Sequence, residues 1–110
     1  MSKLVRRHAH DLHYLLKTTP TIRKAIIEKG DASLICCICE CGKNILRGNV
    51  PLEPHEKRIL RKHKENLRKL VKKSTPVKQK KRIIQKGGFL SAILAPLASL
   101  VLPLVSKLFK

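Results

Sequence analysis

Four cysteines within six residues form the densest group of reactive side chains in this sequence, Cys36-Cys37-Ile38-Cys39-Glu40-Cys41. Cys36 and Cys39 form a CxxC pair, a spacing found in zinc sites. A tetrahedral structural site usually takes a second ligand pair from a separate element, but no further cysteine follows, and the nearest downstream histidine is His55. On a helix the four thiols would point in different directions. We therefore expect them to pack as small apolar residues, with no metal or cofactor and with Cys36 and Cys39 only weak candidate ligands.

The remaining polar residues do not suggest catalysis. His8, His10 and His13 lie close together in the sequence, but no cysteine or acid pair accompanies them to complete a ligand set. The sequence shows no paired carboxylates, no nucleophile–base pair that stands out, and no glycine-rich phosphate loop beyond Gly87-Gly88. The start of the chain is charged and does not read as an export signal, so we expect reduced thiols. The sequence predicts a protein that is not an enzyme.

Positive charge dominates the composition. The 110 residues carry 25 Lys and Arg against 7 Asp and Glu, a net charge of +18. Residues 53–86 alone hold fourteen Lys and Arg and three Glu, a net charge of +11. Repulsion of this size favours a polyanionic partner, and nucleic acid is the first candidate. Aromatic stacking platforms are missing, so we expect backbone contacts to double-stranded DNA without sequence specificity.

The candidate nucleic-acid-binding residues are the basic side chains of a predicted helix over 54–73 and of the segment that follows it. They are Lys57, Arg58, Arg61, Lys62, Lys64, Arg68, Lys69, Lys72, Lys73, Lys78, Lys80, Lys81, Arg82 and Lys86. Ile59/Leu60, His63, Leu67 and Leu70/Val71 form a narrow apolar stripe on the same predicted helix.

The elements that must position these residues are helical. Apolar spacing, capping residues and glycine stops predict helices over 3–17, 20–29 and 32–47, with Thr19 and Asp31 as N-caps. We expect their apolar faces to be Leu4/His8/Leu12/Leu15-Leu16, Ile22/Ala25/Ile26 and Leu34/Ile38/Cys41/Ile45. The predicted fold is all-α: about four short helices, a basic linker and a C-terminal hydrophobic helix. The predicted divisions are a helical bundle (1–50), a basic amphipathic helix (51–73), a mobile cationic linker with Gly-Gly (74–88) and a hydrophobic tail (89–110).

The tail contrasts with everything before it. Residues 89–106 contain no charge, and as a helix they would span about 27 Å, at the short limit for crossing a hydrocarbon core of about 30 Å. A membrane anchor, an interfacial helix and a self-associating segment are all compatible with this composition. A core helix is the structural alternative, although we expect a thin four-helix body to cover only one side of it.

Residues 23–73 and the segment KKRIIQKGGFLSAILAPLASLVLP (80–103) carry a family resemblance. The chain resembles the small basic proteins of adintoviruses and related Polinton (Maverick) elements, proposed counterparts of the adenovirus virion core protein X (mu) precursor. The resemblance implies a virion core protein that condenses DNA, located in the virion or the host nucleus. It also implies a maturation protease of the adenovirus type as a partner. Gln85-Lys86-Gly87-Gly88 would fill that protease's recognition site, with cleavage between Gly88 and Phe89 releasing the tail.

A membrane function is the alternative. On that interpretation the chain is a tail-anchored or membrane-active cationic protein of an intracellular membrane, which contacts lipid through residues 89–110 and has no role on DNA.

Overall fold

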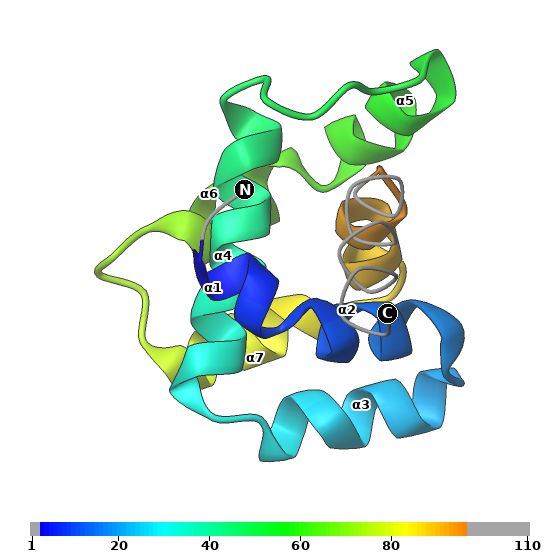
Figure 1. Cartoon of the computed structure of the whole chain (residues 1–110). Helices are drawn as coiled ribbons and strands as arrows, with labels where there is room; N and C mark the ends of the chain where they lie inside the picture. Colours follow the sequence, from blue (N-terminus) through cyan, green and yellow to red (C-terminus); the bar gives the residue numbers. More distant parts are fainter. Residues whose placement is uncertain (1–2, 97–110) are drawn as a thin grey trace.

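Every regular element that the structure describes is a helix. The structure is a computed structural model that describes residues 3–96 (Figure 1). Its helices are α1 (Lys3–Arg7), α2 (Ala9–Lys17), α3 (Pro20–Lys29), α4 (Ala32–Leu46), α5 (Pro54–Lys62), α6 (Lys64–Val71) and α7 (Val77–Ile84). The chain is helical again over 89–96. The predicted all-α class is confirmed, and the part of the predicted C-terminal helix beyond residue 96 lies outside the described residues.

The predicted helix ends in the first half of the chain agree with the structure. Thr19 Oγ1 accepts a hydrogen bond from the Ile22 amide at 3.3 Å, and Asp31 Oδ1 accepts one from the Leu34 amide at 2.9 Å. Both side chains therefore satisfy amides that the first helical turn leaves without a partner. After α4 the chain turns at Gly48, whose φ of +76° is a left-handed conformation that glycine adopts without strain.

Two predicted helices are each broken once, and both breaks fall at a histidine. The predicted helix over 3–17 is α1 and α2, separated at His8 (φ −101°, ψ 16°), and the predicted helix over 54–73 is α5 and α6, separated at His63 (φ −108°, ψ 9°). Val5 and Ala9 are buried on this stripe together with Leu12 and Leu15, whereas Leu4 and His8, which we expected on the apolar face, are half-buried. Helical spacing alone gives no signal for such a break.

The prediction of a mobile cationic linker over 74–88 was wrong for residues 77–84, which form α7. This helix has only two consecutive buried residues, Ile83 and Ile84, which are too few to create a recognisable period in the sequence. It packs against α3, α4 and α6. Tertiary contacts, and not its lysine-rich sequence, thus account for its helical conformation.

The predicted face of α3 was wrong for Ile22 and Ala25, whereas the predicted Ile26 is half-buried and packs against the core. Ile27 is the buried residue of this helix, whereas Ile22 is 43% exposed and Ala25 is exposed. Helix α3 packs against α7. Because the sequence did not predict α7, this contact could not be used to identify the buried face of α3.

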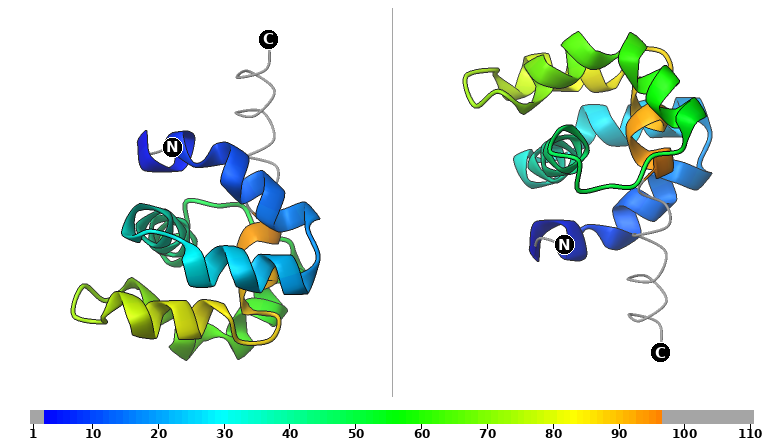
Figure 2. Two further views of the ribbon diagram at one scale, coloured as in Figure 1. Left: turned by 90° about the horizontal axis from the view of Figure 1, so that it is seen from below. Right: turned by 90° about the horizontal axis from the view of Figure 1, so that it is seen from above.

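Helix α4 is the centre of the fold. Figure 2 shows α5, α6 and α7 as one layer on one side of it and α1 and α2 on the other. The predicted stripe of α4 is buried, and so are residues between those positions, Ile35, Cys37, Cys39 and Gly42 among them. A Cβ on Gly42 would lie 2.9 Å from Leu67 Cδ1, so the absence of a side chain there allows α6 to approach closely. Helix α4 is therefore covered on several sides.

The first residues of the predicted tail belong to the core. Phe89, Leu90, Ala92, Ile93 and Leu94 are buried, and Phe89 and Ile93 have no exposed surface. The expectation that the helical body could cover only one side of this segment was wrong for residues 89–96, because only Ser91 and Ala95 are exposed and the other six residues are buried. Among residues 3–96 there is no helix whose length and hydropathy would allow it to cross a membrane.

Candidate nucleic-acid interface

Helices α5, α6 and α7 form a single basic layer on one side of the molecule (Figure 2). Their apolar residues face inward: Leu60, Leu67, Leu70, Ile83 and Ile84 are buried. Three amphipathic helices packed by one face must present their remaining residues to solvent. In this sequence those remaining residues are largely lysine and arginine, so the layer presents positive charge outward.

Most of the candidate DNA-binding residues are exposed on this layer. All fourteen are in or beside the basic layer, and all except the half-buried Lys80 and Lys81 are exposed. The structure thus brings together residues from Lys57 to Lys86 that the sequence places in two separate segments, a predicted helix and a predicted linker.

The positive charge of the layer is not neutralised internally. No lysine or arginine forms a salt bridge with a carboxylate between any two of residues 3–96. Residues 53–86 contain three glutamates, and two of them, Glu53 and Glu56, cap the start of α5 in a capping box. Glu56 Oε1 accepts a hydrogen bond from the Glu53 amide at 2.8 Å. Within residues 3–96 the positive charges of the outer surface are therefore not neutralised by carboxylates, and this surface attracts polyanions.

Three of the predicted residues also have structural contacts. Lys81 Nζ donates to the backbone carbonyl of Glu28 at 3.0 Å, and Lys86 Nζ donates to Asn66 Oδ1 at 3.2 Å. Lys80 lies beside Cys39, where burial raises the pKa of the thiol and the nearby ammonium partly offsets this rise. These three lysines connect α7 and the segment after it to neighbouring elements, so their substitution would affect folding as well as binding.

The predicted cleavage site lies in a turn with an exposed side and a buried side. Gly87 and Gly88 are exposed, and Gly88 has φ +76°. Phe89, on the other side of the predicted scissile bond, is fully buried, and its amide donates to the Lys86 carbonyl at 3.1 Å. A protease binds its substrate as an extended strand, so the turn would have to open before cleavage.

The cysteines lie along α4. Cys36 is exposed, and Cys37, Cys39 and Cys41 are buried free thiols. A hydrogen bond with Cys41 is the main cause, and burial the second, of a strongly raised pKa at Cys37. Cys39 Sγ donates to the Leu70 carbonyl at 3.4 Å. Within residues 3–96, no three His, Cys, Asp or Glu side chains are grouped so as to hold a metal ion. In this part of the chain, no further ligand therefore joins the weak candidates Cys36 and Cys39 in such a group.

One hydrogen-bonded set escaped the sequence analysis. His8 Nε2 lies 2.8 Å from Ser33 Oγ and His8 Nδ1 lies 3.0 Å from Asp11 Oδ2, which is the order of contacts in a Ser–His–Asp triad. His8 and Asp11 are three residues apart in sequence, a signal that could have been noticed, but Ser33 comes from α4. The set joins the break between α1 and α2 to the first turn of α4. It has a structural explanation, since it satisfies the polar groups where the chain bends.

No protein-family model, curated protein or solved structure was found to match this chain, so its family membership remains a prediction from the residues quoted above.

Proposed function

We propose that this is a non-enzymatic protein that binds the phosphate backbone of double-stranded DNA through the basic layer, without sequence preference. The observation that carries the proposal is the outward surface of α5, α6 and α7, where exposed lysines and arginines converge without salt-bridge partners among residues 3–96. Each phosphate contact by such a side chain releases condensed counterions, which makes binding favourable and strongly dependent on salt.

The composition of the layer favours duplex backbone over single strands. The aromatic residues among 3–96 are Tyr14 and Phe89; Tyr14 lies on α2, in the opposite layer, and Phe89 is buried. No tyrosine or phenylalanine is thus available on the basic layer to stack on an unpaired base. Lysine and arginine without neighbouring base-reading elements provide affinity but little sequence discrimination.

The resemblance to adintovirus and Polinton core proteins extends this proposal to a biological setting. The protein would condense DNA inside a virion, with the virion or the host nucleus as its location. A maturation protease of the adenovirus type would cut between Gly88 and Phe89. Exposure of Gly87 and Gly88 supports access to the recognition sequence, and burial of Phe89 indicates that cutting would follow local opening of the turn.

The membrane-active alternative has weaker support. It depends on the apolar segment after Gly88, but Phe89, Leu90, Ile93 and Leu94 are already buried against the protein's own helices. Contact of these side chains with lipid would require that they leave the core.

The test is a titration of short duplexes of unrelated sequence, followed by fluorescence anisotropy at several salt concentrations. We expect similar affinities for all sequences and a steep linear fall of log K with log salt. A triple variant at the C-terminal end of α6 (the α6 triple variant), Arg68→Ala/Lys69→Ala/Lys72→Ala, should weaken binding and reduce the magnitude of the salt slope by about 2 to 3, roughly one per lost phosphate contact.

The matched control removes the same charge from the opposite layer. Arg6, Arg7 and Lys17 are exposed on α1 and α2, so Arg6→Ala/Arg7→Ala/Lys17→Ala changes net charge equally without touching the basic layer. It should leave the salt slope nearly unchanged. Equal losses in the two triple variants would mean that net charge, and not the basic layer, determines binding, and an absence of duplex binding would refute the proposal.

A further inference from the structure

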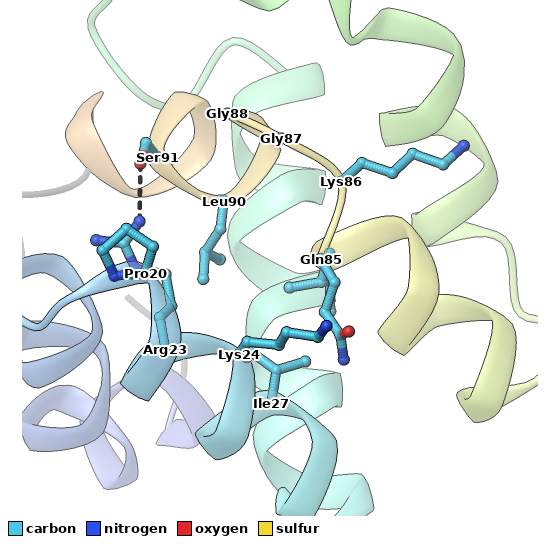
Figure 3. A pocket seen from close by; sticks show the side chains of 11 residues that line it. Pro20, Arg23, Lys24, Ile27, Gln85, Lys86, Gly87, Gly88, Leu90 and Ser91 are labelled. Carbon is cyan, nitrogen blue, oxygen red and sulfur yellow. Dashed lines mark hydrogen bonds between the residues drawn. The ribbon is translucent and has the colours of Figure 1, made fainter.

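A pocket lies between the start of α3 and the Gly87-Gly88 turn (Figure 3). It encloses about 130 Å³, and one water molecule occupies about 30 Å³ of liquid. The volume is thus sufficient for a small polyatomic ion. The lining residues are Pro20, Arg23, Lys24 and Ile27 of α3, Ile84 to Gly88 around the end of α7, and Leu90 and Ser91. No acidic residue is among them.

Arg23 fixes one wall of this pocket. Its Nε donates to the Leu15 carbonyl at 2.8 Å, Nη2 donates to the Thr18 carbonyl at 3.4 Å, and Nη1 donates to Ser91 Oγ at 3.1 Å. A guanidinium has five N–H groups, so two are left for a ligand. Because the Ser91 hydroxyl accepts from Arg23, its own proton is directed elsewhere and can be donated. The wall is held rigidly and still offers donors.

Lys24 supplies the second charge. Figure 3 shows its side chain reaching across the pocket toward Gln85, whereas the side chain of Lys86 points away from the pocket, in agreement with its hydrogen bond to Asn66. The amides of Gly87 and Gly88 donate no hydrogen bond to another group within residues 3–96. Two cations, a hydroxyl and the Gly87-Gly88 turn therefore line one cavity, and its apolar residues Ile27, Ile84 and Leu90 exclude part of the solvent.

We propose that this pocket binds a phosphate group. Its available groups are mainly hydrogen-bond donors with two positive charges, and a phosphate is a compact anion with four acceptor oxygens that suits such a set. The site is separate from the outward surface of α5 and α6, and it does not depend on duplex binding by the basic layer. The phosphate could be free or carried by nucleic acid.

The experiment is a titration of the full chain with inorganic phosphate, at ionic strength held constant with chloride, followed by ¹H–¹⁵N correlation spectra. The chain has five glycines, whose signals lie in a distinct spectral region. Those of Gly87 and Gly88 should shift and saturate, and that of Gly48, in a turn outside the pocket, should not. Lys24→Gln should raise the Kd about three- to tenfold.

Lys29→Gln is the control, because Lys29 is also exposed on α3 but does not line the pocket. It should leave the Kd unchanged. Shifts of Gly87 and Gly88 that do not saturate, or an equal effect of the two lysine variants, would overturn the proposal. The α6 triple variant should bind phosphate normally, so loss of duplex binding and loss of this site are measured separately.

Two duplexes then identify the source of the phosphate. If a duplex with 5′-phosphate ends saturates the Gly87 and Gly88 shifts and the same duplex with 5′-hydroxyl ends does not, the pocket accepts terminal phosphates. Equal saturation by both supports internal phosphodiesters as the ligand. If neither duplex produces these shifts while inorganic phosphate does, the pocket is a site for free phosphate.

Discussion

The ring of His63 meets the ring of Phe89 edge to face, with centroids 5.7 Å apart and an angle of 78° between the planes. His63 is the residue at which α5 and α6 separate, and Phe89 is the residue that follows Gly88. The contact therefore joins the bend of the basic layer to the predicted scissile bond. The break in the predicted helix over 54–73 therefore lies beside the segment that begins at Phe89.

Truncation of Phe89 should severely destabilise the protein. A fully buried phenylalanine loses its burial and leaves a cavity when it is replaced by alanine, so Phe89→Ala should lower the free energy of unfolding by about 3 to 5 kcal/mol. Chemical denaturation followed by circular dichroism measures this. Phe89→Leu keeps most of the volume and should cost much less. If Phe89→Ala changed stability by less than Phe89→Leu, the burial described here would be incorrect.

The two glycines of the turn should respond differently to substitution. Gly88 has φ +76°, which an alanine adopts with strain, whereas Gly87 is not in this region and has no atom within 4 Å of an added Cβ. Gly88→Ala should lower the free energy of unfolding by about 1 kcal/mol, and Gly87→Ala should leave it nearly unchanged.

Gly87→Ala is consequently the cleaner test of proteolytic processing. It alters the predicted recognition sequence without straining the turn, so it should abolish cutting by an adenovirus-type protease while the fold is retained. Mass spectrometry of the products locates the cut. Continued cutting between residues 88 and 89 in this variant would show that the glycine pair is not recognised.

Stability should decrease at alkaline pH because of the buried thiols. The folded state raises the pKa of Cys37, through its hydrogen bond with Cys41 and then burial, and burial raises that of Cys39. Below the ordinary thiol pKa of 9.0, both states hold these protons and the stabilisation is complete. Above it the unfolded thiols ionise while the folded ones do not, so the free energy of unfolding falls with rising pH.

Denaturation curves at a series of pH values test this prediction. Cys37→Ala should make the alkaline loss of stability shallower, and Cys36→Ala, at the exposed position, should not. At neutral pH, iodoacetamide should modify Cys36 before the buried thiols. An identical pH dependence in both variants would exclude Cys37 as the cause.

The His8–Ser33 contact should prove structural. We expect a fluorophosphonate probe, which labels activated serines covalently, to leave Ser33 unmodified. Ser33→Ala should instead cost about 1 kcal/mol of stability, the usual value for one hydrogen bond. Unfolding curves and intact mass measure the two effects. Labelling of Ser33 that disappears in His8→Gln would show that the three residues act as a catalytic set.

The sequence was most informative where one residue determines a local structure. Thr19 and Asp31 were identified as caps because a side chain can satisfy the amides of its own helix, and the stripe of α4 was found because its apolar residues recur at helical spacing. Helix α7 and the bends at His8 and His63 could not be predicted, since their causes are contacts with residues far along the chain. The outward position of the candidate DNA-binding residues was predictable from composition, but the convergence of α5, α6 and α7 in one layer was not.

Burial of Phe89 and of most residues up to Pro96 changes what cutting at Gly88 would accomplish. A severed chain would be a two-piece complex, held together by the same apolar contacts that close the core of the uncut protein. Before the cut, the covalent connection keeps the segment at a high effective concentration beside its binding site; after it, the segment is a ligand that can dissociate. Release would then depend on protein concentration and temperature, and the body left behind would lose the side chains that fill its centre. Proteolysis would thus create a new chain end and also give the association of the two pieces a finite lifetime.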